Sequence, residues 1–304
     1  MNVISVVNYK GGVGKTTLIS NIAAKLSSEG KKVLLIDLDP QGSLTFSFMH
    51  TDEWSKKYSN SKTIKNWFDG KLNDKDVNLD DYVINDLYIN RKYLRNNSLD
   101  LIASHLGLYD ISMEMAIKLG GRGRRNISKN KNDCLFMLKR GLKDIGNKYD
   151  YVFIDCQPSF DLLTQNAIVA SDYYIIPTKF DYLSTLGIDS LIFHIENLIK
   201  EIGEASKEFS FKGYNLNPKL LGVVGNMVTI SKENNMINFN ENILNEFKKD
   251  KYKLFKSRIR NNPEFMDSKE LIPAIMKKSN SSNKTREKIK AEIEAVTLEF
   301  KERI

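Results

Sequence analysis

The most constraining feature of the chain is a glycine-rich turn between an apolar segment and a helical pattern near the N-terminus. Residues 3–8 read VISVVN, which predicts a buried strand, and residues 16–30 place apolar side chains every fourth position, which predicts a helix. Between them, residues 10–15 read KGGVGK, so that Lys10 and Lys15 enclose three glycines. A strand, a glycine turn and a helix in this order predict a loop that holds phosphate groups.

The residue types in this turn are ones that favour the binding of an anionic phosphate group. Glycines let phosphates approach the backbone, and the N–H groups and dipole at a helix start favour negative charge. Lys15 is expected to neutralise the β- and γ-phosphates, and Thr16 to place its hydroxyl on Mg²⁺. The predicted nucleotide-binding residues of the loop are Gly11, Gly12, Val13, Gly14, Lys15, Thr16 and Thr17.

Further apolar strands alternate with helical patterns along the chain. We predict strands at 31–39, 99–104, 149–155, 173–178 and 219–228, with helices at 133–146 and 184–205 among them. Uniformly apolar strands alternating with helices predict an α/β fold, a doubly wound and mostly parallel sheet with helices on both faces. We expect one domain over 1–304, with an insertion-like stretch at 46–98 and a C-terminal helical segment at 250–304, which reads as short helices, the last at about 284–302.

Composition narrows the possible environments and partners. The 304 residues contain no apolar run long enough to span a membrane and no signal-peptide pattern, so we expect a cytoplasmic protein. Cys134 and Cys156 have no metal or disulfide spacing and are expected to be buried. The net charge is +8, and residues 118–131 carry six Lys or Arg and no acid. Such a basic cluster indicates contact with a polyanion.

The turn and four later blocks resemble the ParA/MinD family of ATPases. The string KGGVGKTT resembles the family's deviant Walker A motif, in which a lysine stands early and Tyr9 replaces the first glycine of the ordinary motif. Further blocks resemble the family at 33–45 (VLLIDLDPQGSLT), 99–108 (LDLIASHLGL), 149–168 (YDYVFIDCQPSFDLLTQNAI) and 221–228 (LGVVGNMV). The resemblance covers most of 1–45 and 99–230, and it implies a P-loop NTPase fold with ATP and Mg²⁺ as cofactors.

The resemblance implies roles for single residues. Lys10 would reach across an ATP-bound homodimer to the phosphates of the other subunit, and Asp39 would orient the attacking water, so that Lys10, Lys15 and Asp39 form the catalytic set. Thr16, Asp37 and Asp155 would hold Mg²⁺, the aspartates through water. A carboxylate that ends a buried strand is costly unless a cation or donors meet it, which supports these assignments.

Two further positions carry less direct information. Pro177 and Asn226 match residues that line the adenine pocket in the family. The family usually has two prolines after the Walker B aspartate and its neighbour, whereas here Asp155 and Cys156 are followed by Gln157 and then Pro158. This departure leaves the shape of the loop open.

Family members differ in what the dimer binds. An iron–sulfur role is disfavoured by two unspaced cysteines. A membrane anchor is disfavoured because the last helix mixes Glu with Lys on its polar face, so we expect it to pack on the body. Basic clusters favour contact with DNA phosphates. The candidate residues are Arg122, Arg124, Arg125, Arg258, Arg260, Lys277 and Lys278.

The sequence therefore predicts a ParA-type partition ATPase. Its Mg-ATP dimer would bind DNA without sequence preference on the nucleoid, and a ParB-like adaptor would stimulate hydrolysis, so that a plasmid or chromosome is segregated. Two alternatives stay open: a membrane-associated positioning ATPase of the MinD type, and a weakly hydrolysing ATP-dependent localisation scaffold.

Overall fold

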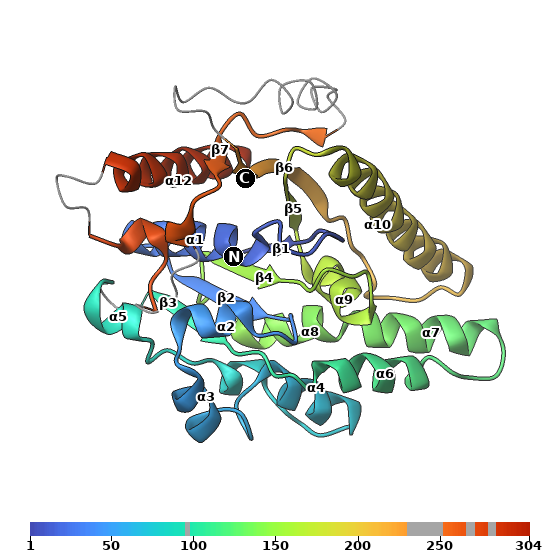
Figure 1. Cartoon of the computed structure of the whole chain (residues 1–304). Helices are drawn as coiled ribbons and strands as arrows, with labels where there is room; N and C mark the ends of the chain where they lie inside the picture. The colour runs from blue at the N-terminus through green and yellow to red at the C-terminus, as the bar shows by residue number, and fades with distance from the viewer. Residues whose placement is uncertain (95–97, 230–251, 266–270, 279–283) are drawn as a thin grey trace.

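In the computed structural model, seven parallel strands among the described residues form the centre of the molecule (Figure 1). The structure describes residues 1–94, 98–229, 252–265, 271–278 and 284–304. The strand order is β3-β2-β4-β1-β5-β6-β7, and each neighbouring pair is parallel. The strands are β1 (Asn2–Val6), β2 (Val33–Asp37), β3 (Leu99–Ile102), β4 (Tyr151–Asp155), β5 (Tyr173–Thr178), β6 (Lys219–Val228) and β7 (Arg258–Arg260).

Strand register brings the carboxyl ends of three strands to one edge of the sheet. β1 lies between β4 and β5, and β2 pairs with β4 so that Asp37 lies opposite Asp155. All five residues of β2 are buried, as expected for a strand covered on both faces. Because parallel strands share a direction, the loops after β1, β2 and β4 converge at the carboxyl edge, where ligands of open α/β sheets bind.

Helices cover both faces of the sheet, and successive residues of β1 alternate between the two layers: Ile4 and Val6 face one layer, Val3 and Val7 the other. The first layer contains α1 (Lys15–Ser28), α2 (Ser43–Phe48), α5 (Tyr88–Lys92) and α12 (Lys284–Arg303). The second contains α4 (Ile64–Leu72), α6 (Leu108–Lys118), α7 (Arg124–Leu135), α8 (Met137–Ile145), α9 (Leu162–Ala170) and α10 (Tyr182–Glu208). The predicted doubly wound fold is thereby confirmed.

The apolar stripe of α12 faces inward. Ile289, Ile293, Val296 and Phe300 are fully buried, in the same cluster as the apolar side of α1. The ring of Phe300 lies 5.4 Å from that of Phe153 in β4. The last helix thus packs on the body, as the sequence predicts. No helix within the described ranges has the length and apolar content to cross a membrane.

Where the structure describes it, the stretch 46–98 forms short elements around the β3 end of the sheet. Besides α4 and α5 they include α3 (Thr51–Lys57) and a 3₁₀ turn, η1 (Leu79–Tyr82). Trp67 is fully buried, and a Cβ atom at Gly141 of α8 would lie 2.4 Å from its ring. Helices of at most nine residues give little periodicity, which is why this stretch reads weakly from the sequence.

Two predicted elements differ from the structure. The helix predicted at 133–146 is two helices, because α7 ends at Leu135 and the buried Phe136 turns the chain before α8. Most of the basic stretch 118–131 belongs to α6 and α7. The polar start of α7 has no apolar periodicity that would indicate a helix.

The segment 250–304 is predicted as helical, but Arg258–Arg260 adds β7 beside β6. Three residues are too few for a strand pattern.

Candidate functional site

The phosphate loop joins β1 to α1 and depends on close contact with β6. Gly12 and Gly14 have φ values of 68° and 80°, left-handed conformations that favour glycine. A Cβ atom at Gly14 would lie 2.4 Å from Nδ2 of Asn226. That Nδ2 donates to the carbonyls of Val13 at 2.9 Å and Gly14 at 3.0 Å. Gly14 therefore allows both the turn and the approach of Asn226.

A cavity of about 30 Å³ adjoins this contact. It lies beside the start of α1 and the end of β6, and the base-binding role of Asn226 stays a prediction. Pro177 lies elsewhere, buried in β5, and its carbonyl accepts a hydrogen bond from Nδ2 of Asn8 at 2.8 Å. The lining residues of the cavity are Thr17, Asn226, Met227, Arg260, Asn261, Asn262 and Phe265.

Lys15 is buried at the first position of α1. Its ammonium donates to the carbonyl of Asn8 at 3.4 Å. Burial lowers the pKa of Lys15, and the negative charge of Asp155 opposes that shift. A buried ammonium with one long hydrogen bond lacks acceptors. Phosphate oxygens would supply them.

Asp155 ends β4 beside the first turn of α1. Its Oδ2 accepts a hydrogen bond from Oγ1 of Thr16 at 2.5 Å. Its Oδ1 is buried and has no hydrogen-bond partner among the described residues. Burial raises the pKa of Asp155 to about 7, although Thr16 and Lys15 act in the opposite direction. The carboxylate is thus placed where a cation would stabilise its charged form.

Asp37 is fully buried at the end of β2 and already has three donors. Its Oδ2 accepts from both the backbone N and Oγ1 of Thr45, each at 2.7 Å, and its Oδ1 accepts from the N of Asp39 at 3.1 Å. Burial, together with the nearby Asp155, raises the pKa of Asp37 well above its usual value. These contacts fit a role toward a metal through water.

Asp39 is half-buried on the loop after β2. Its Oδ1 accepts from the N of Gln41 at 3.0 Å, and its carbonyl accepts from Oγ of Ser104 at 2.6 Å. Its Oδ2 makes no hydrogen bond to any residue that the structure describes. The backbone of Asp39 is therefore fixed while one carboxylate oxygen remains available for a water molecule.

These groups fit a magnesium–nucleotide complex better than a metal ion alone. Within the described ranges, no three His, Cys, Asp or Glu residues gather as a metal site. Mg²⁺ in nucleotide sites takes one or two protein groups and completes its octahedron with phosphates and water. The unpartnered Oδ1 of Asp155 and the hydroxyl of Thr16 provide such groups.

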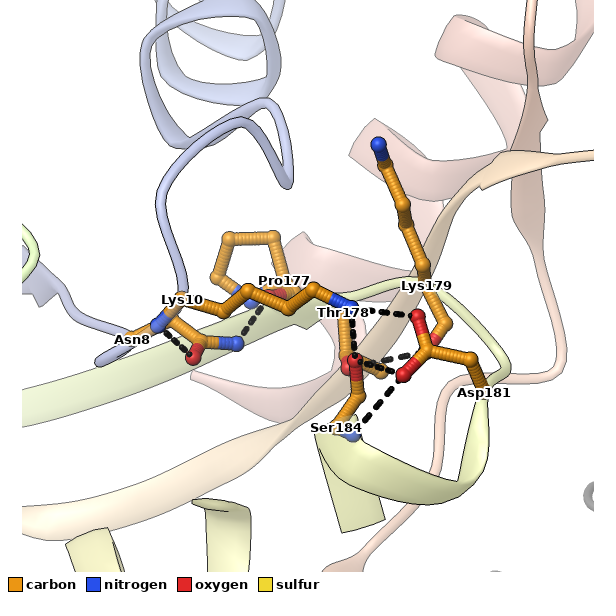
Figure 2. A network of polar contacts seen from close by, with 7 residues as sticks. All are labelled: Asn8, Lys10, Pro177, Thr178, Lys179, Asp181 and Ser184. Carbon is orange, nitrogen blue, oxygen red and sulfur yellow. Dashed lines mark hydrogen bonds and ion pairs between the residues drawn. The ribbon is translucent and has the colours of Figure 1, made fainter.

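The side chain of Lys10 extends toward Asp181 and Ser184 of its own chain (Figure 2). Its Nζ lies 2.6 Å from Oδ2 of Asp181 and 3.4 Å from Oγ of Ser184. Asp181 also caps α10, since its Oδ1 accepts from the N of Ser184 at 2.9 Å. Burial would raise the pKa of Asp181, but the hydrogen bonds from Lys10 and Ser184 lower it below its usual value. In this structure the lysine is held by an internal ion pair.

Gln157, at the position where the family has proline, connects the loop after β4 to α9. Its Nε2 donates to Oδ2 of Asp161 at 2.6 Å. Asp161 caps α9 by accepting from the N of Thr164 at 3.0 Å. Pro158 remains close to the phosphate loop, 3.9 Å from a Cβ built at Gly11.

The seven basic candidates lie in two groups. Arg122, Arg124 and Arg125 are exposed around the start of α7, while Arg258 and Arg260 belong to β7 and Lys277 and Lys278 come before α12. Two of the second group are not presented to solvent: Arg260 pairs with Glu292 at 2.6 Å, and Lys277 is buried. A role in DNA contact remains a prediction for all seven.

Four residues of the site escaped the sequence reasoning: Asn8, Thr45, Gln41 and Asp181. Only Asp181 had a local signal in the sequence. It stands three residues before Ser184 and ahead of an apolar run, a pattern typical of a helix N-cap. The other three act through contacts that depend on how loops meet at the sheet edge.

Known proteins share this arrangement over much of the chain. The family model described as an AAA domain matches residues 1–208. The uncharacterised protein Rv1708 of Mycobacterium tuberculosis is 34% identical over 186 residues, 61% of this chain and 49% of its own length. The chain therefore spans about half the length of that relative. Soj of Bacillus subtilis, a sporulation initiation inhibitor protein, is 32% identical over 192 residues, 62% of this chain and 63% of its own.

The chromosome partitioning protein ParA of Myxococcus xanthus is 30% identical over 199 residues, 66% of this chain and 59% of its own. Among solved structures, a plasmid partition protein from Borrelia burgdorferi is 26% identical with a TM-score of 0.64, covering 100% of this chain and 99% of that one. Cobyrinic acid a,c-diamide synthase from Mycobacterium smegmatis, solved with an ATP analogue and magnesium, is 26% identical with a TM-score of 0.60, covering 89% and 92%. With its KGGVGKTT loop and parallel sheet, the chain belongs to the ParA/MinD family of ATPases.

Proposed function

We propose that this protein is an ATP-dependent partition ATPase of the ParA type. Mg-ATP would join two copies into a dimer that binds DNA without sequence preference. A ParB-like adaptor would stimulate hydrolysis, release the dimer and so segregate a plasmid or chromosome. The protein would act in the cytoplasm, on the nucleoid.

The observation that carries this proposal is the pair of lysines in one phosphate loop. Lys15 is buried beside Asp155 and Thr16, whereas Lys10 lies at the surface in an exchangeable ion pair with Asp181. One lysine is thus built into the monomer's site, and the other is available to a second copy. The names of two relatives, ParA of Myxococcus xanthus and the Borrelia partition protein, support the choice of partition over other roles.

The chemistry follows from placement and charge. Lys15 would neutralise the β- and γ-phosphates, and Thr16 with Asp155 and Asp37 would hold the magnesium ion, which supplies further positive charge at the transferring phosphoryl group. Asp39 would orient the attacking water through its available Oδ2. Lys10 of the second copy would stabilise charge that develops in the transition state. Phosphoryl transfer depends mainly on such positioning and electrostatic stabilisation.

DNA contact would rest on charge rather than base recognition. The net charge is +8, and Arg122, Arg124 and Arg125 form an exposed basic group at the start of α7. Arginines that contact phosphates release counterions, so that affinity falls steeply with salt. In a dimer, two such groups would act together on one duplex.

The test compares DNA and lipid as partners of the full chain. We expect a duplex of mixed sequence to shift on a gel with ATP and Mg²⁺ but not with ADP, and the affinity to fall at least tenfold between 50 and 200 mM salt, on the order expected for a few phosphate contacts. Anionic vesicles in a sedimentation assay should leave the protein in the supernatant. ATP-dependent pelleting with vesicles and no DNA shift would instead establish the membrane-associated alternative.

Turnover separates the ATPase from the scaffold alternative. We expect phosphate release to be slow for the protein alone and faster when DNA and its adaptor are present. A protein that binds ATP and releases no phosphate under any of these conditions would contradict the proposal.

A further inference from the structure

Ser104 lies where the loop after β3 meets the loop after β2. In the sheet, Ile36 of β2 pairs with Ile102 of β3, and both strands run toward the carboxyl edge. Ser104, two residues beyond that pair, is 2% exposed. Its hydroxyl, its backbone N–H and its carbonyl each make a hydrogen bond to a different residue. A buried residue whose polar groups are all engaged holds together the segments that it joins.

Two of these hydrogen bonds lead to the aspartates of the site. Oγ of Ser104 donates to the carbonyl of Asp39 at 2.6 Å, and that carbonyl also accepts from the N of Gly42 at 2.9 Å. The N of Ser104 donates to Oγ1 of Thr45 at 2.9 Å, and the same oxygen donates to Oδ2 of Asp37 at 2.7 Å. Because the bond from Ser104 uses a lone pair of the Thr45 hydroxyl, the hydroxyl proton is directed to Asp37.

The third hydrogen bond joins Ser104 to the insertion-like stretch, for which the sequence indicates no role. Nε1 of Trp54 in α3 donates to the carbonyl of Ser104 at 3.1 Å. The Trp54 ring contacts that of Phe46 in α2, with ring centroids 5.6 Å apart, and that of His105 at 5.5 Å. Trp54 therefore connects α2, α3 and the loop after β3.

We propose that Ser104 and Trp54 are positioning residues for ATP hydrolysis. Trp54 holds the loop after β3 in place, and Ser104 fixes the backbone of Asp39 and the direction of the Thr45 hydroxyl. The insertion-like stretch thereby serves the reaction through Trp54. This inference rests on the proposed function, which assigns Asp39 to the attacking water and Asp37 to the magnesium ion.

The hydroxyl of Ser104 and its N–H can be separated by mutation. Ser104→Ala removes Oγ and keeps the N–H that donates to Thr45, so the contact with Asp37 persists. The Asp39 carbonyl keeps its bond from Gly42 and loses the second donor, which lets the loop shift. Displacement of a positioned group by about 1 Å can cost on the order of a hundredfold in rate.

The first measurement separates turnover from nucleotide affinity in the full chain with Mg-ATP. We expect Ser104→Ala to lower turnover at saturating ATP by about tenfold or more, because Asp39 is misplaced. The affinity for a fluorescent ATP analogue should stay within about threefold, since the contacts of Lys15 are unchanged. Ser47→Ala is the matched control, because that hydroxyl donates within its own helix to the carbonyl of Ser43 at 2.8 Å. Parental turnover in Ser104→Ala, or equal losses of turnover and affinity, would overturn the proposal.

A double-mutant cycle tests whether Ser104 acts through Asp39. The double variant Asp39→Ala/Ser104→Ala should hydrolyse ATP, followed by release of labelled phosphate, as slowly as Asp39→Ala alone. A further loss as large as that of Ser104→Ala alone would mean that the hydroxyl acts elsewhere, and the proposal is wrong. A parental rate in Asp39→Ala contradicts the proposed function. A slow Asp39→Ala with a parental rate in Ser104→Ala contradicts this inference alone.

Trp54→Phe tests the contribution of the insertion-like stretch. The change keeps an aromatic ring and removes the Nε1 donor to Ser104, so we expect turnover to fall at least about threefold with ATP affinity unchanged. Tyr58→Phe, at the end of the same helix, removes a hydroxyl and keeps its ring, and it should turn over ATP like the parent. Circular dichroism checks that both variants fold. Parental turnover in Trp54→Phe would overturn the role of the insertion-like stretch.

Discussion

The inner and outer halves of the phosphate loop differ in how firmly the monomer holds them. The inner half, residues 13–16, is fixed by buried contacts: Asn226 binds two of its carbonyls, and Thr16 donates to Asp155. The outer half, residues 8–12, contains Lys10, whose side chain is 39% exposed and pairs with Asp181, itself 33% exposed. The inner half is already arranged to bind a nucleotide. The outer half is held by the ion pair between Lys10 and Asp181, which Lys10 can exchange for another acidic partner.

The difference indicates which step each half controls. A preformed inner half lets a monomer bind the nucleotide without rearranging. A partly exposed ion pair contributes only about 0.2–1 kcal/mol, so Lys10 can leave Asp181 at small cost when a second copy offers phosphates. The order of events would thus be nucleotide binding first and dimerisation second.

The largest expected effect comes from the inner half. Lys15→Ala removes the buried ammonium that faces the phosphates, and loss of one partner of a buried charge pair costs roughly 3–5 kcal/mol. We expect the affinity for a fluorescent ATP analogue to fall at least a hundredfold, measured by anisotropy. Lys25→Ala, further along α1, is the control. Lys15→Ala binding within threefold of the parent would contradict the preformed site.

An intermediate effect is expected at Asp39, on the loop after β2. Asp39→Ala should bind ATP normally, because the carboxylate is assigned to the attacking water, and should lower turnover by roughly 10²- to 10⁴-fold, as for loss of a catalytic carboxylate. The dimer should then persist in ATP, which sedimentation measures. A variant that hydrolyses ATP at the parental rate would rule out the assigned role.

The smallest effect is expected at the outer half. Asp181→Asn keeps a hydrogen-bonding cap for α10 but removes the charge that holds Lys10. We expect the dissociation constant of the ATP-bound dimer to fall by up to about fivefold, the equivalent of about 1 kcal/mol, and the gain to shrink in high salt. Ser184→Ala removes a neighbouring contact and leaves the ion pair. Weaker dimerisation in Asp181→Asn would mean that Asp181 assists the dimer rather than restraining Lys10.

Local patterns were sufficient where a function depends on neighbours in sequence. The phosphate loop, its helix and the apolar strands each carry their own signal, so the α/β fold was predictable, and so was the position of the loop. The short helices in 46–98 and the three-residue β7 could not be predicted, because elements of this length show no hydrophobic periodicity. The partner of Lys10 was likewise hidden, since Asp181 lies on another segment.

The sequence alone determined the glycine turn, the strand-and-helix alternation and the family. These depend on backbone freedom and on apolar spacing, which are properties of adjacent residues. Only the tertiary structure decided that Lys10 pairs with Asp181, 171 residues away, and that Tyr109, Met113 and Ile117 of α6 stay exposed while the stripe on α12 is buried. Burial of a helix face depends on whether the sheet offers a surface to cover, which no local pattern records.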